Sequence, residues 1–119
     1  MKAVFNWLSK PQKPSESEPE FDFASVTEAE VAVLFKHSPT CATSWFAQRQ
    51  VDAFVAANPS VPVYTVSVRN RELAKEIATR TNVRHESPQV IVFRQGQVVA
   101  HTSHEGVTSD YLEKVTASR

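Results

Sequence analysis

Apolar and polar positions follow two different periods along the chain, and the places where the period changes predict its elements. Residues 31–36, VAVLFK, are an apolar and β-branched run, which predicts a strand buried on both faces. From residue 41 the apolar positions recur at helical spacing until Asn58, which predicts a helix of about four turns. Residues 61–68 are again β-branched and aromatic, and we expect a second buried strand there.

Two more helices and a hairpin are expected in the rest of the chain. Residues 70–81 form an amphipathic pattern behind Asn70, a residue type that often caps the N-terminus of a helix. Two β-runs follow within residues 89–103, and the glycine-containing link RQGQ between them predicts a hairpin. The chain closes with a helical pattern over residues 108–119, with Thr108 as its expected N-cap.

The order of these elements predicts the fold class. A capping-box spacing from Thr27 to Glu30 predicts one helical turn before the first strand, and the order from Val31 onward is β-α-β-α-β-β-α. We expect strands that a single helix separates to pair in parallel, and the hairpin to add an antiparallel partner. The sequence therefore predicts an α/β domain with a mixed four-stranded sheet and helices on both faces, an order that resembles a thioredoxin-like domain.

Composition divides the chain into an extension and one domain. Residues 9–20 contain three of the seven prolines together with serine, glutamate and lysine, and no large apolar residue, which is typical of a solvated connector. We therefore interpret residues 1–20 as an N-terminal extension with a linker rich in proline, serine and glutamate. Residues 21–119 have the size and apolar content of a single domain.

Charge and hydropathy exclude several classes of partner. Thirteen basic and thirteen acidic residues cancel, so the chain lacks the basic excess that nucleic-acid binding favours. Its apolar runs are too short for a membrane span, and the opening MKAVFNWLSK lacks the features of a signal peptide. A single cysteine also suits a reducing compartment. We therefore expect a cytoplasmic protein with no nucleic-acid or membrane partner.

The one cysteine, Cys41, lies in the stretch HSPTCATSW. A lone cysteine is most often a small buried side chain, so its surroundings decide how it is interpreted. Cys41 follows a strand and a short loop and opens the longest predicted helix, with Thr40 as the expected N-cap and Cys41 as the first helical residue. The free N–H groups and the dipole at that helix end favour the thiolate. The histidines and the cysteine show no paired metal-ligand spacing, so we expect no metal site.

A second candidate element is HESPQV, residues 85–90. Pro88 stands directly before the third strand, where it cannot donate a ladder hydrogen bond, and Ser87 must avoid the α region. A Ser87–Pro88 bond at this place is a candidate for the cis isomer. Lys36 and His37 precede the cysteine and are candidates for a positive charge near it.

The strings LFKHSPTCATS and VRHESPQVIVFRQGQVVAHTSHEGVT together resemble the bacterial monothiol bacilliredoxins, the YtxJ-like family of thioredoxin-fold proteins. The resemblance covers roughly residues 30–110. It implies that Cys41 is the nucleophile and that Ser44 replaces the resolving cysteine of dithiol thioredoxins. It also implies that Pro88 is the cis-proline facing the thiol, and that the backbone of Ser87 pairs with the substrate. The family commonly has a proline where this chain has Ala42.

The resemblance implies an activity and its co-substrate. Such proteins remove bacillithiol, a small thiol, from mixed disulfides on the cysteines of other proteins, through a bacillithiol adduct on Cys41. Bacillithiol is then a co-substrate, no cofactor is tightly bound, and a second reducing thiol or redox protein must release the adduct. Because bacillithiol carries malate carboxylates, cationic residues near the site are candidates for binding it. These candidates are Lys36, His37, His85, Arg84 and His104.

The residues leave two other functions open. One is a monothiol glutaredoxin-like carrier that ligates an iron–sulfur cluster through Cys41 and an external thiol. Such carriers have a glycine and a phenylalanine between the cysteine and the serine, and CATS has neither. The other is a non-catalytic thioredoxin-like binding module, in which Cys41 has an ordinary pKa. Of Trp45 and Phe46, which could shape a groove, we expect at least one to pack in the core.

Overall fold

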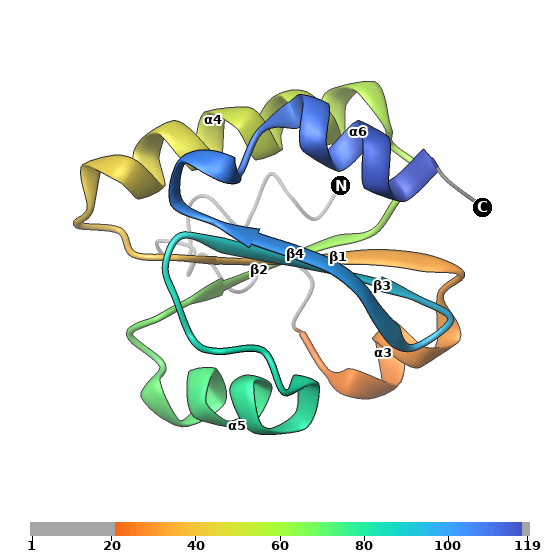
Figure 1. Cartoon of the computed structure of the whole chain (residues 1–119), viewed down its shortest axis with the longest axis horizontal. Coiled ribbons are helices and arrows are strands. Elements are labelled where there is room, and N and C mark those ends of the chain that lie inside the picture. The colour runs from red at the N-terminus through yellow and green to blue at the C-terminus, as the bar shows by residue number, and fades with distance from the viewer. Residues whose placement is uncertain (1–20, 118–119) are drawn as a thin grey trace, which may run out of the picture.

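A computed structural model describes residues 21–117 (Figure 1). The predicted extension and linker over residues 1–20 lie outside the described residues. Four strands form one sheet in the order β2-β1-β3-β4. The elements in chain order are α3 (Phe23–Glu28), β1 (Val31–His37), α4 (Ala42–Ala57), β2 (Val63–Ser67), α5 (Arg71–Thr81), β3 (Gln89–Arg94), β4 (Gln97–Ser103), the short 3-10 helix η1 (His104–Gly106) and α6 (Ser109–Ala117).

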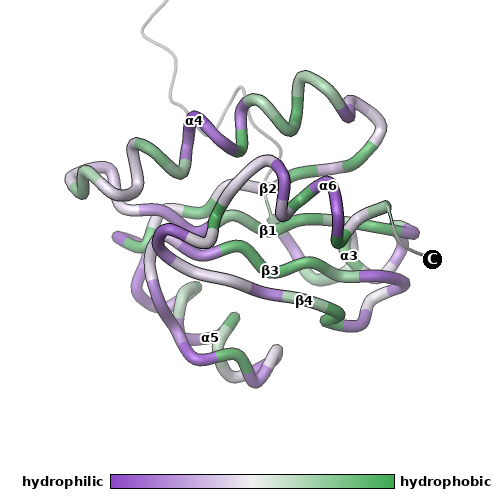
Figure 2. The backbone as a smooth tube through the Cα atoms, turned by 45° about the horizontal axis from the view of Figure 1, so that its top comes forward, coloured by the Kyte–Doolittle hydropathy of each residue, from purple (hydrophilic) through white to green (hydrophobic). Residues whose placement is uncertain are grey.

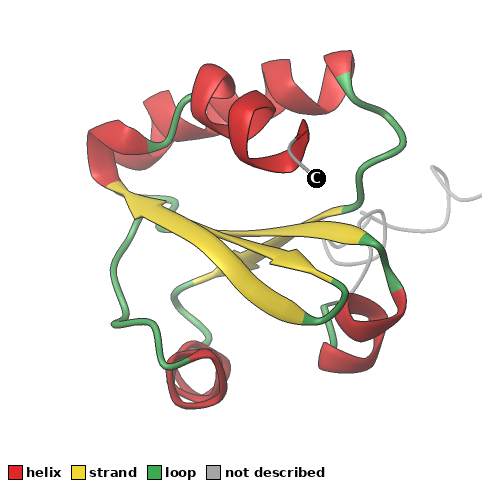
Figure 3. Cartoon of the chain, turned by 45° about the vertical axis from the view of Figure 1, so that its right-hand side comes forward, coloured by secondary structure: helices red, strands yellow, loops and turns green. Residues whose placement is uncertain are grey.

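The sheet separates two helical layers, which confirms the predicted α/β class. Helices α4 and α6 cover one face, while α3 and α5 cover the other (Figures 1 and 3). Side chains alternate along β1 between two cores, with Val33 and Phe35 packed towards α4 and α6. Ala32 and Leu34 belong to the core on the α3 and α5 side. The apolar stretches of Figure 2 accordingly run through β1 and β3, at the centre of the sheet.

Strand β3 corrects the expected pairing. β1 and β2 are parallel as predicted, but β3 does not pair with β2 and runs antiparallel to β1, with Lys36 opposite Gln89. Figure 3 shows helix α5 almost along its axis, while the strands run across the view. Helix α5 therefore crosses the strands and does not run antiparallel to them. The chain therefore re-enters the sheet at the end where β1 finishes, and Pro88 lies at the same end as Cys41.

Two other expectations for the strands and helices are wrong. The second strand is not buried on both faces, because β2 is an edge strand and only Val66 is fully buried. Helix α3 starts before the predicted capping box, because the Asp22 side chain accepts a hydrogen bond from the Ser25 N–H at 3.0 Å and acts as the N-cap. Thr27 instead lies inside the helix, where its hydroxyl donates to the Ala24 carbonyl.

Two further cap predictions and the predicted hairpin are confirmed. Asn70 caps α5 by accepting from the Leu73 N–H at 3.2 Å, and Thr108 caps α6 by accepting from the Tyr111 N–H at 3.0 Å. The hairpin between β3 and β4 turns on Gln95 and Gly96, whose φ angles of 53° and 82° match the type I′ turn that two-residue hairpins favour.

The cap of α6 gives a stability prediction. Thr108→Ala leaves the Tyr111 N–H without its side-chain acceptor, so we expect the free energy of unfolding to fall by about 1 kcal/mol. Urea denaturation monitored by circular dichroism measures the change. The control is Thr79→Ala on the exposed surface of α5, which should be neutral or slightly stabilising because alanine favours helix. Equal losses in both variants would contradict the capping role.

Candidate active site

Cys41 stands at the start of α4 but outside its first turn. Its backbone is extended, with φ −103° and ψ 128°, while its carbonyl accepts the first helical hydrogen bond from the Trp45 N–H at 3.2 Å. Cys41 is therefore the N-cap itself, and the prediction that Thr40 is the N-cap is wrong. Thr40 lies in the preceding turn, with its hydroxyl 3.3 Å from that of Ser38. The cysteine sulfur thus stands where a capping oxygen would.

The N-terminal end of α4 stabilises the thiolate of Cys41. The Cys41 residue is partly exposed. The neutral thiol makes no capping hydrogen bond. The backbone N–H of Ser44, followed by that of Thr43, nevertheless holds the pKa of the thiol below its usual value, because both can donate to the thiolate. The side chains of Thr43 and Ser44 act in the same direction and contribute less. An accessible thiol with a lowered pKa is the form that attacks disulfides.

Ser44 joins the thiol to the loop before it. Its side chain is buried, and its hydroxyl accepts a hydrogen bond from the Ser38 N–H at 3.0 Å. The same hydroxyl lowers the pKa of the Cys41 thiol by hydrogen bonding to the sulfur. A hydroxyl can accept one hydrogen bond and donate another, so Ser44 serves both contacts at once.

The Ser87–Pro88 segment lies at the same end of the sheet. The Ser87–Pro88 bond is cis, and Pro88 is buried. The Pro88 carbonyl accepts from the His104 N–H at 2.8 Å, which fastens this segment to the start of η1. The hydroxyl of Ser87 is buried without a hydrogen-bond partner among the described residues. The antiparallel pairing of β1 with β3 therefore places the two sequence motifs at the same end of the sheet.

Lys36 does not reach the surface, so the expectation that it binds a ligand in solvent is corrected. Its side chain is fully buried, and its ammonium donates to Gln89 Oε1 at 2.8 Å. Burial lowers the pKa of Lys36 to about 8, while the nearby Glu86 carboxylate opposes that shift. Sequence reasoning missed Gln89, whose only signal was its place directly after Pro88.

The two candidate histidines differ in their surroundings. His37 ends β1 and is half-buried, with its ring stacked on Phe35 at a centroid distance of 5.5 Å. His85 is exposed beside the Ser87–Pro88 segment. Partial burial, and then the charge of Lys36, lower the pKa of His85, while Glu86 opposes them. His85 is therefore less readily protonated than an ordinary histidine.

Glu86 and His104 meet across the edge of the site. The His104 Nε2 atom lies 3.4 Å from a Glu86 carboxylate oxygen. A hydrogen bond from the Ser103 hydroxyl lowers the pKa of Glu86, and His104, Arg84 and His101 lower it further. Arg84, His101 and His104 therefore gather around the Glu86 carboxylate.

The exposed rings of Trp45 and Phe46 line a groove along the first turns of α4, which contradicts the expectation that one of them packs in the core. Trp45 is 56% exposed and Phe46 64% exposed, because the buried stripe of α4 runs through Ser44, Ala47, Val51 and Phe54 instead. The two rings pack edge to face at 5.0 Å, and the Arg49 guanidinium lies over Trp45 at 5.2 Å. The groove continues along η1 to His104 and Val107.

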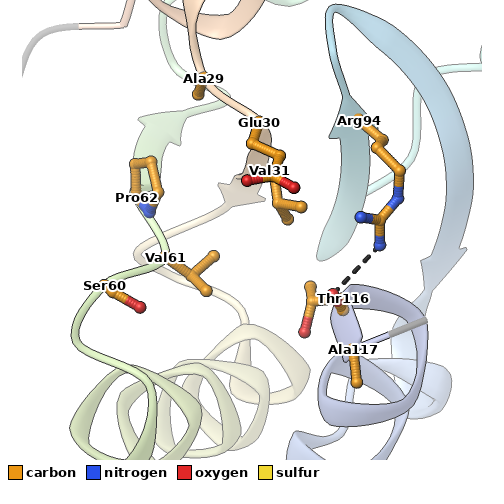
Figure 4. A pocket seen from close by; sticks show the side chains of 9 residues that line it. All are labelled: Ala29, Glu30, Val31, Ser60, Val61, Pro62, Arg94, Thr116 and Ala117. Atoms are coloured by element: carbon orange, nitrogen blue, oxygen red, sulfur yellow. Dashed lines mark hydrogen bonds between the residues drawn. The ribbon is translucent and has the colours of Figure 1, made fainter. Parts of the chain in front are cut away.

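A second pocket lies at the opposite end of the sheet, where β1 begins and β3 ends (Figure 4). Arg94 points to the end of α6, where its guanidinium donates to the Thr116 carbonyl at 3.1 Å and the Val115 carbonyl at 3.5 Å. A cation at a helix C-terminus satisfies free carbonyl groups there. This contact stabilises the fold and lies away from the thiol.

Within residues 21–117, no three His, Cys, Asp or Glu side chains gather in a way that could hold a metal ion. None of the helices in the same span is long and apolar enough to cross a membrane.

The sequence comparison decides the family. A family model described as monothiol bacilliredoxin BrxC matches residues 15–112, which include Cys41, Ser44 and Pro88. The chain belongs to the monothiol bacilliredoxin family. Membership and fold together support a thiol-oxidoreductase role for this bacilliredoxin.

Solved structures show the same fold. A protein described provisionally as an oxidoreductase with a thioredoxin fold is 32% identical, with a TM-score of 0.72 over 76% of this chain and 81% of that one. The reduced desulfothioredoxin of Desulfovibrio vulgaris Hildenborough is 22% identical, with a TM-score of 0.66 over 84% and 91%. The thioredoxin of Trypanosoma brucei brucei is 16% identical, with a TM-score of 0.64 over 91% and 100%. This bacilliredoxin therefore has the thioredoxin fold.

Ser44 gives a prediction about reactivity. Ser44→Ala removes the hydroxyl that bonds to the Cys41 sulfur, so we expect the pKa of the thiol to rise while staying below its ordinary value, because the backbone N–H groups remain. The pH dependence of the iodoacetamide reaction rate, followed by intact mass, measures this pKa. Thr40→Ala is the control and should leave the midpoint unchanged. Equal shifts in the two variants would refute the role of Ser44.

Lys36 gives a prediction about stability and pH. Between a folded pKa of about 8 and the ordinary 10.5, the unfolded chain holds a proton that the folded protein has lost. The Lys36 contribution to stability is therefore unfavourable below pH 8 and improves as the pH rises through this window. The free energy of unfolding of Lys36→Met, relative to that of wild type, should be more favourable at pH 7 than at pH 10. Urea denaturation at the two pH values measures this difference.

The matched control is Lys75→Met, which removes an exposed lysine of α5. Its difference from wild type should be the same at both pH values. If the difference in unfolding free energy between Lys36→Met and wild type is also the same at both pH values, the folded protein does not shift the pKa of Lys36.

Proposed function

We propose that this bacilliredoxin removes bacillithiol from mixed disulfides on protein cysteines. The observation that carries the proposal is the partly exposed Cys41 sulfur at the N-cap of α4, where backbone N–H groups of Ser44 and Thr43 lower the pKa of the thiol. Thiol–disulfide exchange needs an accessible thiolate near neutral pH. Membership of the monothiol bacilliredoxin family supports bacillithiol as the transferred thiol.

The proposed step transfers a disulfide without net oxidation. The Cys41 thiolate attacks the bacillithiol sulfur of the mixed disulfide, and a new disulfide forms between Cys41 and bacillithiol. The bond between bacillithiol and the substrate cysteine breaks, so the substrate sulfur leaves as a thiolate and takes a proton from water. Bacillithiol is the co-substrate, and the reaction uses no tightly bound cofactor.

The second half of the cycle depends on another molecule. Cys41 is the only cysteine in the sequence, and Ser44 cannot form a disulfide. A second reducing thiol or redox protein attacks the bacillithiol sulfur of the adduct, forms a new disulfide with bacillithiol and releases the Cys41 thiolate. The partners of the protein are therefore bacillithiolated proteins and this reductant, and the reducing cytoplasm is the compartment in which both steps can run.

Mass spectrometry tests the proposal. The reduced protein is mixed with a peptide that carries one bacillithiolated cysteine, and intact masses are followed over time. We expect free peptide thiol and a bacillithiol adduct on the protein in equal amounts, and no adduct on Cys41→Ser. The control peptide carries an S-methylated cysteine and should not react, because it offers no disulfide.

The competing functions give different results. Absence of an adduct together with an ordinary Cys41 pKa would refute the exchange activity and favour a binding module. Visible absorbance after anaerobic reconstitution with iron and sulfide, lost in Cys41→Ser, would favour an iron–sulfur carrier.

A further inference from the structure

A buried lysine lies beneath the site and is not used by the exchange step itself. The Lys36 side chain has no exposed surface and lies on the face of the sheet that packs against α3 and α5. Within residues 21–117, no carboxylate lies within ion-pair distance of its ammonium. A buried charge without an ion pair is costly, and an apolar side chain of similar length would avoid that cost. The position therefore requires an explanation other than stability.

The partner of Lys36 is Gln89, which directly follows Pro88. The two residues face each other across the β1 and β3 pairing, and Gln89 is also buried. An ammonium can only donate hydrogen bonds, so it holds the Gln89 Oε1 atom towards itself at 2.8 Å. The Nε2 atom must then face the other way, where it donates to the Arg84 carbonyl at 2.9 Å and the Ser103 hydroxyl at 3.4 Å.

These two contacts hold the segment that carries Ser87 and Pro88. The hydrogen bond to the Arg84 carbonyl ties the start of the segment to Gln89 at its end. The Ser103 hydroxyl also bonds to Glu86 in the middle of the segment. The two ends of the Pro88 segment are thus fixed to each other and to β4.

The same group of contacts continues to the edge of the site. Glu86 meets the His104 ring at 3.4 Å, and the His104 N–H donates to the Pro88 carbonyl at 2.8 Å. A series of polar contacts therefore starts at the buried Lys36 ammonium and ends on Pro88.

We propose that Lys36 is a positioning residue, which acts through Gln89 to place the Ser87–Pro88 segment where a mixed disulfide aligns with Cys41. This inference rests on the proposed function and adds the residue that sets the alignment. The lowered pKa of the Cys41 thiol comes from the start of α4, and Lys36 is not among its causes. Lys36 should therefore affect the reaction with an aligned disulfide and not the intrinsic reactivity of the thiol.

Two substitutions test this separation. Lys36→Met keeps an unbranched side chain that is one atom shorter and removes the donor. Gln89→Glu keeps an acceptor for Lys36 but removes the donor to Arg84 and Ser103. For each variant we expect the exchange rate with a bacillithiolated peptide to fall about tenfold, because misplaced reacting groups lose rate steeply. The iodoacetamide rate of Cys41 should stay within about twofold, because alkylation needs no aligned disulfide.

The double variant and a surface control sharpen the test. Lys36→Met combined with Gln89→Glu should lose no more exchange rate than either single variant, because both interrupt the same series of contacts. Lys75→Met removes an exposed lysine and should leave both rates unchanged. Amide hydrogen exchange adds a direct readout, since the His104 N–H that donates to Pro88 should exchange faster in Lys36→Met and Gln89→Glu.

Several results would overturn the proposal. One is an unchanged exchange rate in both variants, and another is an equal fall of the exchange and alkylation rates in a folded variant. If Lys36→Met does not fold, the rates of Gln89→Glu alone test the positioning role. A wild-type protein that forms no bacillithiol adduct would refute the proposed function. In that case the hydrogen-exchange rate of the His104 amide would still test the positioning role of Lys36. An unchanged amide hydrogen-exchange rate in both variants would refute that role.

Discussion

The antiparallel pairing of β1 with β3 is the constraint on which the site depends. It sets Lys36 opposite Gln89 and so brings the start of β3 to the end of the sheet where β1 leads into Cys41. Parallel pairing would have placed Pro88 at the far end of β1, where Arg94 now supports the end of α6. Two motifs about 45 residues apart meet only because α5 crosses the strands and the chain returns to the same end.

Local backbone geometry, more than the surrounding charge, sets the chemistry of the thiol. Lys36 and His37 precede Cys41, but the first is buried against Gln89 and the second stacks on Phe35. The groups that lower the pKa of the Cys41 thiol are instead the N–H groups of Ser44 and Thr43. A helix start provides such donors whatever its side chains are. Charged residues of the Pro88 segment can therefore serve alignment without altering the thiolate.

The sequence predicted features that depend on near neighbours and missed those that depend on packing. Asn70 and Thr108 were found as caps because a cap is satisfied within three residues. The exposure of Trp45 and Phe46 was not predictable, because helical spacing does not say which side of α4 faces the sheet. The burial of Lys36 was missed for a similar reason, since a lysine at a strand end is usually solvated and its partner lies 53 residues away. The N-cap differed by one residue, within the ordinary uncertainty of helix ends.

The Ser44 hydroxyl contributes to the one-cysteine site in a way that a second thiol at this position would not. Its hydroxyl accepts from the Ser38 N–H and also helps to lower the pKa of the Cys41 thiol, so one small side chain acts on both the loop and the thiol. A thiol accepts hydrogen bonds weakly and would hold the Ser38 N–H less well. In the proposed cycle, the serine supports the first exchange step through its hydrogen bonds, and the second step requires an outside thiol. The residue that steadies Cys41 is therefore one that cannot form an internal disulfide with it.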